Sequence, residues 1–257
     1  PSLYRSYVQY DPAKANKLLD DIGLTKRDRE GFRTYTDGKR MVFYLSLSSD
    51  DTGIGPSQFI VDDWAAVGVR VLIRNESRAL WLTKAQALEH DFNAWSGNGN
   101  FPALWPEAYV PIENCGFARG FARWYAQGGL YGPIPPERAG GCVEPPVGHP
   151  LRQAMELYDH YRAAPTPKEQ QVIFKQILKI AAENVWTFNV ASPQPTLIAV
   201  KDDFRNVPRK AIHTFLMMSP ANTGIETYYH ESELFGFVSI DDDIEDIFEL
   251  TEDGKDV

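Results

Sequence analysis

The sequence predicts an α/β fold built on a mainly parallel sheet flanked by helices. Apolar runs typical of buried strands occur at residues 41–47, 69–73 and 92–95. The segments between these runs have apolar residues at helical spacing. Strands that alternate with helices in this way usually form right-handed crossovers in a parallel sheet.

The first helix is expected to begin at Asp11 and Pro12, ahead of the first strand. Aspartate is a good N-cap, and proline suits the first helical position because its missing N–H is not needed there. Leu18 and Ile22 continue the apolar stripe of this helix. Gly23 is expected to end it.

The next elements are a turn at Asp37-Gly38, the strand at 41–47 and a helix at 56–67. Trp64 belongs to the apolar stripe of that helix, so we expect it to lie in the core. Gly68 is expected to end the helix before the second strand.

The second strand, at 69–73, is followed by a helix at 77–88 and a third strand at 92–95. Trp81 fits the buried face of this helix and is also expected in the core.

A loop rich in glycine, amides and aromatic rings follows the third strand. From Trp95 to Tyr109 it reads WSGNGNFPALWPEAY. In open α/β sheets, ligands bind at the edge formed by the carboxyl ends of the strands. The loop is therefore expected to lie where a ligand would bind.

The second half of the chain opens with a long irregular region over 102–150, rich in proline and glycine. Two helices are predicted after it, at 150–162 and 167–184, and two strands after them, at 185–190 and 196–200. The acidic end of the chain is expected to be disordered.

The net charge of −9 comes from that acidic end. The segment from Glu231 to Val257 holds eleven acidic residues and one lysine, which leaves 24 acidic and 25 basic residues in the rest of the chain. No cluster of basic residues is present, which argues against a nucleic-acid partner. No apolar run approaches the length of a membrane span, and no signal peptide opens the sequence.

Motifs of catalytic sites are absent from the sequence. The five histidines lack metal-ligand spacing, and there is no GxSxG elbow and no P-loop. We therefore predict neither an enzyme nor a bound metal or cofactor. Cys115 and Cys142 lie in one Gly/Pro-rich region and are either a loop disulfide or two thiols.

Three sets of residues follow one another in the order of a known family. They are Tyr10 to Leu19 with Gly23, Gly31-Phe32-Arg33 and Asp37-Gly38-Lys39; the helix-to-strand step ending in Gly68-Val69-Arg70-Val71; and the helix pair at 151–184 followed by Trp186-Thr187-Phe188-Asn189. Together they resemble the peptide-type (family 5) solute-binding proteins of ABC importers, over about residues 7–230.

The resemblance implies a periplasmic-binding-protein-like lobe, an incomplete type II solute-binding fold. Residues 1–186 would be the carboxyl-terminal ligand-binding lobe, 187–235 a segment that returns to the first lobe, and 236–257 an acidic, disordered tail. Family members are two-lobed and longer. We therefore expect the first lobe and an export signal to be missing, as in a fragment or a truncated gene product.

The resemblance also implies a function and a site. The whole protein would capture a solute noncovalently between its lobes, in the periplasm or another extracytoplasmic space, and dock on an ABC permease. The ligand-binding residues would be Trp95, Ser96, Asn98, Asn100, Trp105, Tyr109, Trp186 and Asn189.

Peptide-binding members commonly carry an aspartate in the loop after the third strand, where it pairs with the amino terminus of the peptide. Amides and rings stand there in this chain, and these suit a neutral polyhydroxylated molecule. An oligosaccharide is therefore an alternative to an oligopeptide. Two other functions stay open: a protein-interaction module without a transport role, whose acidic tail docks on a basic partner, and a ligand-sensing receptor subunit.

Overall fold

A computed structural model describes residues 7–50, 53–95, 103–113, 115–188 and 197–231. The chain divides into two units, one formed by Pro1–Gly97 and Phe101–Pro193, the other by Asn98–Asn100 and Gln194–Val257. None of the described helices is long and apolar enough to cross a membrane. The division into lobe, return segment and tail stays a prediction, and the tail lies outside the described residues.

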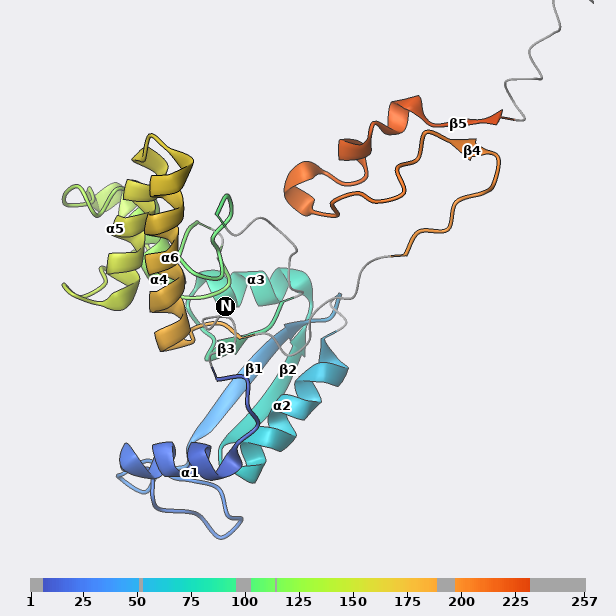
Figure 1. The fold of residues 1–257 in the computed structure, drawn as a ribbon. Helices are drawn as coiled ribbons and strands as arrows, with labels where there is room; N and C mark the ends of the chain where they lie inside the picture. The colour runs from blue at the N-terminus through green and yellow to red at the C-terminus, as the bar shows by residue number, and fades with distance from the viewer. Residues whose placement is uncertain (1–6, 51–52, 96–102, 114, 189–196, 232–257) are drawn as a thin grey trace, which may run out of the picture. The chain divides into compact units, whose positions relative to one another are not determined.

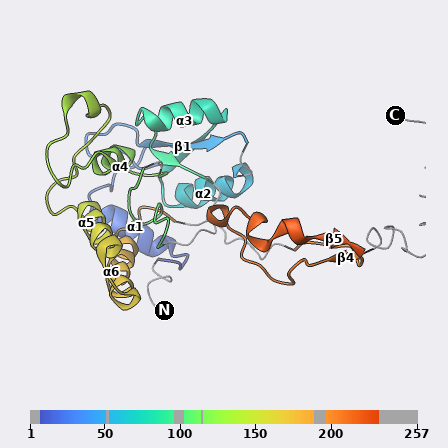
Figure 2. The same cartoon turned by 90° about the horizontal axis from the view of Figure 1, so that it is seen from above.

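A parallel three-stranded sheet lies at the centre of the first unit (Figure 1). β1 (Val42–Ser48) is the middle strand, between β2 (Arg70–Glu76) and β3 (Phe92–Asn93). The connections run through α2 (Ile54–Ala66) and α3 (Arg78–Gln86), which lie on opposite faces of the sheet (Figure 2). The predicted order of strands and helices and the parallel pairing are confirmed.

One face of the sheet is apolar and forms the main core. Leu45 and Leu47 of β1 and Val71 of β2 are buried there. Side chains of α2 pack on this face together with α1 (Pro12–Asp21). Asp11 caps α1 as expected, because its Oδ1 accepts a hydrogen bond from the N–H of Lys14 at 2.9 Å.

The other face of the sheet is polar. Because side chains alternate along a strand, Ser46 and Ser48 of β1 point away from the apolar core. They pair in register with Arg74 and Glu76 of β2. Helix α3 covers the carboxyl end of this face through Trp81, whose Nε1 donates a hydrogen bond to the carbonyl oxygen of Ser46 at 3.3 Å.

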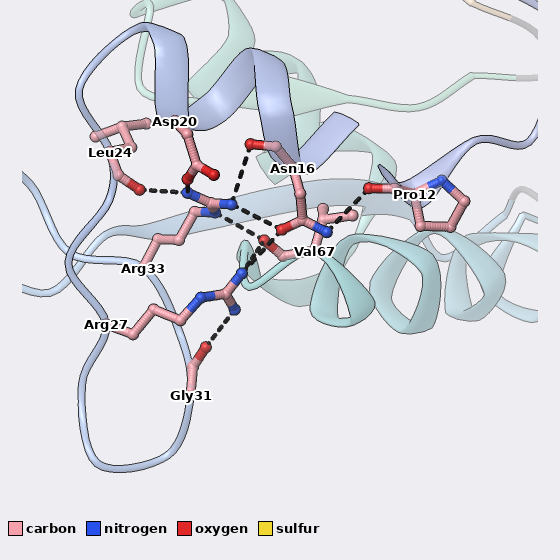
Figure 3. Close-up of polar contacts among 8 residues, drawn as sticks. All are labelled: Pro12, Asn16, Asp20, Leu24, Arg27, Gly31, Arg33 and Val67. Atoms are coloured by element: carbon pink, nitrogen blue, oxygen red, sulfur yellow. Dashed lines mark hydrogen bonds and ion pairs between the residues drawn. The ribbon is translucent and has the colours of Figure 1, made fainter. Parts of the chain in front are cut away.

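A buried arginine ties α1 and the following loop to the end of α2 (Figure 3). Arg33 is 2% exposed. Its guanidinium donates to the carbonyl oxygen of Val67 at 2.9 Å, to Oδ1 of Asp20 at 2.6 Å and to Oδ1 of Asn16 at 2.7 Å. It also donates to the carbonyl oxygens of Asn16 and Leu24. We call this group the Arg33 cluster.

A helical part follows in the same unit. It consists of α4 (Arg119–Ala126), the short 3₁₀ helix η2 (Pro136–Arg138), α5 (Pro150–Ala163) and α6 (Pro167–Asn184). The last two helices pack side by side, as Figures 1 and 2 show. They enclose a second core with α4, formed by the buried side chains of Val110, Trp124, Ala154, Met155 and Ile177.

The structure corrects two predictions about this half of the chain. The region 102–150 is not irregular throughout, because it contains α4 and η2. Helix α4 was not predicted because it contains a glycine, Gly120, which is unfavourable in a helix. Gly120 is buried, and its backbone lies close to Val143. The strand predicted from 185 is wrong over its described part: Val185 has a φ of +51° and caps α6, and residues 186–188 form no strand.

The strand predicted at 196–200 is also wrong where it is described, because residues 197–200 are extended without a partner strand. The second unit has a different, antiparallel pair: β4 (Phe204–Arg205) and β5 (Tyr229–His230). Three 3₁₀ turns lie between them, η3 (Phe215–Met217), η4 (Ala221–Thr223) and η5 (Ile225–Thr227). Strands of two residues are too short for a periodic apolar pattern to reveal them.

Candidate functional site

The carboxyl ends of the three parallel strands meet at one edge of the sheet. β1 ends at Ser48 and β2 at Glu76, and these two residues are opposite each other in the register. Asn93, the last residue of β3, is opposite Ser46. The chain of β3 continues along this edge, because the N–H of Ala94 donates to the carbonyl oxygen of Ser46 at 3.2 Å.

Trp95 lies at this edge on a support provided by α3. Its ring is stacked on that of Trp81, with 4.9 Å between centroids and 24° between planes. Trp81 is only 5% exposed, whereas Trp95 is 47% exposed. The buried ring therefore holds an accessible one in place. An aromatic ring held in this way can stack on an apolar or sugar face of a ligand without first losing rotamer freedom.

Arg78 adds a positive charge to this support. Its Cζ lies 5.1 Å from the centroid of the Trp95 ring, within the range of a cation–π contact. Arg78 and Trp81 are three residues apart on α3, so they share one side of the helix. We call Arg78, Trp81 and Trp95 the tryptophan platform.

Buried polar atoms lie at the same edge. The Oγ of Ser48, Oδ1 of Asn93 and Oε2 of Glu76 are buried and have no hydrogen-bond partner among the described residues. The other oxygen of Glu76 forms an ion pair with Lys84, and Nδ2 of Asn93 donates to the carbonyl oxygen of Gly116 at 3.3 Å. The edge thus combines an aromatic surface with unused hydrogen-bonding capacity.

The other residues predicted from the sequence have different surroundings. Tyr109 packs edge-on against Phe174, with centroids 6.3 Å apart, as part of the second core. Trp186 is stacked on Phe117 at 6.5 Å, and Trp105 is partly exposed. The structure therefore brings Trp95 to the sheet edge and gives Tyr109 and Trp186 partners elsewhere in the unit.

The remaining predicted residues, Ser96, Asn98, Asn100 and Asn189, lie outside the described residues. Their contact with ligand stays a prediction.

Two members of the platform were not predicted as site residues. Trp81 was expected in the core, and this is confirmed, but its position beneath Trp95 depends on how α3 packs on β1. Arg78 carried a signal that sequence analysis could have used. It lies three residues before Trp81 in a helix that follows a strand end, so the two share one helical face near the expected ligand edge.

Both cysteines are free thiols, which is the second of the two alternatives considered. Cys115 is fully buried, and its Sγ donates to the carbonyl oxygen of Phe117 at 2.8 Å. Burial raises the pKa of this thiol to about 11. Such a thiol is unsuited to nucleophilic chemistry near neutral pH. Within the described ranges, no three His, Cys, Asp or Glu side chains gather into a possible metal site.

Comparison with known proteins shows that the first part of the chain is similar to one family. Residues 1–111 match the model described as bacterial extracellular solute-binding proteins, family 5 Middle. A comparison with curated protein sequences gives no match. The family match covers α1, the whole parallel sheet and the start of the loop beyond it.

Solved structures support the same assignment. An oligopeptide-binding protein, OppA, is 25% identical with a TM-score of 0.60, and the similarity covers 90% of this chain and 37% of OppA. A periplasmic oligopeptide-binding protein from Thermotoga maritima is 17% identical, with a TM-score of 0.51 and coverage of 71% and 31%. MelB from Agrobacterium fabrum, in complex with stachyose, is 15% identical, with a TM-score of 0.50 and coverage of 70% and 25%.

These comparisons confirm the family resemblance and the periplasmic-binding-protein-like α/β fold. The chain spans about a third of the length of OppA, since the similarity covers 37% of that protein.

Proposed function

We propose that this chain, whose residues 1–111 match the model of the family 5 bacterial extracellular solute-binding proteins, is part of the solute receptor of an ABC importer. The receptor works outside the cytoplasm, captures its solute without covalent chemistry and delivers it to a membrane permease. A second lobe, outside this chain, closes over the solute. The observation that supports this role most directly is the tryptophan platform at the carboxyl edge of the parallel sheet.

The physical basis is the rigidity of the platform. Trp81 is fixed by burial and by its hydrogen bond to Ser46, and Trp95 is stacked on it with nearly half of its surface exposed. Little entropy is lost when a ligand contacts an aromatic ring that is already ordered. The edge therefore suits capture, which needs a preformed surface.

The solute class follows from the same edge. The described residues offer an aromatic ring, a guanidinium and unpaired polar atoms, and all of these can bind an oligosaccharide or a short peptide. Both classes occur among the proteins of similar fold: OppA is named for oligopeptides, and MelB was solved with stachyose. We propose an oligosaccharide or an oligopeptide, with Trp95 in contact with it.

Titration calorimetry of the 257-residue chain tests this proposal, with neutral oligosaccharides and short peptides as probes. Trp95→Ala should weaken binding of the active probe about tenfold, because an aromatic contact of this kind contributes about 1 kcal/mol or more. Phe59→Ala is the matched control: Phe59 is an exposed aromatic residue on α2, away from the carboxyl edge. Equal affinity of the Trp95 variant and the unsubstituted chain would remove Trp95 from the site. Failure of the chain to bind any probe of either class would refute a solute site on this lobe.

A further inference from the structure

Helix α4 carries two arginines on one side. Arg119 and Arg123 are separated by one helical turn, so their side chains are neighbours on the helix surface. Both residues are part-buried. Like charges at this spacing repel each other and destabilise a helix.

Neither arginine has a counter-charge in the described part of the chain. Neither guanidinium forms an ion pair or a hydrogen bond with a described residue, and Nε of Arg119 is buried without a partner. Three other part-buried arginines have partners: Arg70 pairs with Glu30 at 2.8 Å, Arg152 pairs with Glu144 at 2.9 Å, and Arg74 lies over the Tyr44 ring. Removing part of a charge from water is costly unless another group compensates it.

The arginine pair is bordered by two segments, the chain around Gly141, which lies against Nη1 of Arg123, and the segment that leads into β3. Gly120 lies against Leu88, since a Cβ at the glycine would be 3.3 Å from Cδ1 of the leucine. Asn93, at the far end of this segment, donates to the carbonyl oxygen of Gly116 just before α4. His90 lies between these two contacts along the chain, and its Nδ1 is buried without a partner.

The electrostatic potential at the arginine pair is positive, because no neighbouring charge among the described residues compensates the two guanidinium groups. Burial and the neighbouring Arg123 lower the pKa of Arg119, and burial and then Arg119 lower the pKa of His90. Two carboxylates are near, but each acts on another group. Asp91 influences His90 and accepts a hydrogen bond from the N–H of Tyr44 at 2.9 Å, and Glu107 influences Cys115.

We propose that Arg119 and Arg123 form a binding site for a small oxyanion, either a phosphate or a carboxylate. Guanidinium groups recognise both through paired, charge-assisted hydrogen bonds, and an anion between the two would replace their repulsion by attraction. The unpaired nitrogen of His90 is an additional donor or acceptor near the site. This site is separate from the tryptophan platform and does not depend on the proposed solute.

Thermal unfolding of the chain with added anions tests the site. Inorganic phosphate and succinate are each compared with chloride at constant ionic strength. Phosphate also stabilises proteins in general by exclusion from their surface, so the comparison needs variants. The variants are Arg119→Gln and Arg123→Gln, and the control is Arg29→Gln, which removes an equal charge from an exposed arginine without a described contact.

We expect 50 mM phosphate or succinate to raise Tm of the unsubstituted chain and of the Arg29 variant by about 3 °C, the size produced by a ligand with a Kd of about 10 mM in a protein of this length. The two α4 variants should lose most of this rise. They should also be at least as stable as the unsubstituted chain in chloride, because each removes a repulsion. Which anion acts identifies the oxyanion as phosphate or carboxylate.

Three results would overturn the site. The first is an equal rise in Tm in all four proteins, which general exclusion of the anion would produce. The second is no rise with either anion. The third is a large loss of Tm for both α4 variants in chloride, since this would show that the arginines are compensated by other groups of the chain.

Discussion

Replacement of Arg33 by methionine should lower the free energy of unfolding by about 3 kcal/mol. Methionine fills much of the volume of the arginine side chain but cannot donate hydrogen bonds. The backbone carbonyl oxygens of Asn16, Leu24 and Val67 would each lose the hydrogen bond from Arg33, and that of Val67 would keep a second donor, Arg27 at 3.3 Å. A buried acceptor left without a donor costs about 1–3 kcal/mol, and such costs within one cluster do not add fully.

The ion pair within the cluster sets the upper limit of this loss. Breaking a fully buried pair costs about 3–5 kcal/mol, because the remaining charge is stranded away from water. Here the side chain of Asp20 is 51% exposed, so its carboxylate regains water once Arg33 is removed. The expected loss therefore lies at the lower end of that range. It is smaller than the total stability of most proteins of this size, so the variant should still fold.

Urea unfolding followed by circular dichroism measures the loss. A difference of 3 kcal/mol should move the midpoint by about 1 M or somewhat more, with an unchanged slope. Arg29→Met is the matched control, and it should stay within about 0.5 kcal/mol because Arg29 is exposed. Asp20→Asn should cost about 1–3 kcal/mol, because the buried guanidinium of Arg33 loses its counter-charge although the amide oxygen of the asparagine can still accept its hydrogen bond. A midpoint for Arg33→Met equal to that of Arg29→Met would refute the argument.

Two further predictions concern the helical part of the first unit. Gly129→Ala should cost about 3 kcal/mol, because the new Cβ would overlap the buried ring of Trp124. Gly132→Ala, where a Cβ would meet nothing within 4 Å, should be neutral or slightly stabilising, and equal urea midpoints of the two variants would contradict this. Cys115 should make stability fall as pH rises from 9 to 11, because its pKa rises from 9.0 to about 11 on folding and the unfolded chain releases its proton first. The loss should reach about 2 kcal/mol by pH 11. In urea titrations, the free energy of unfolding of a Cys115→Ala variant should therefore fall by about 2 kcal/mol less over this pH range than that of the unsubstituted chain.

The sequence was sufficient for the sheet and its flanking helices because their signals are local. Asp11 and Pro12 mark the start of α1 by capping, and the apolar runs of β1 and β2 are long enough to be read as buried strands. The failures have a common cause. Gly120 in α4 and Val185 after α6 take their conformations from neighbours distant in sequence or from a helix end, which local propensity does not describe.

The candidate site was predictable only in part for the same reason. The position of Trp95 after β3 was enough to place it at the edge formed by the carboxyl ends of the strands. Its support by Trp81 required knowledge of how α3 crosses the polar face of the sheet. The arginine pair of α4 was out of reach, because the helix itself was not predicted and the missing counter-charge is a property of the packed structure.

The two faces of the sheet explain how one small lobe can hold both a stable core and an adaptable edge. The apolar face, with Leu45 and Val71, is closed by α1 and α2, and the Arg33 cluster locks that side. The packing of α3 on the polar face does not depend on these contacts, because Trp81 donates a hydrogen bond directly to the backbone of β1. Residues at the carboxyl edge can therefore vary while the apolar face keeps the fold. One architecture can then carry sites for different ligands.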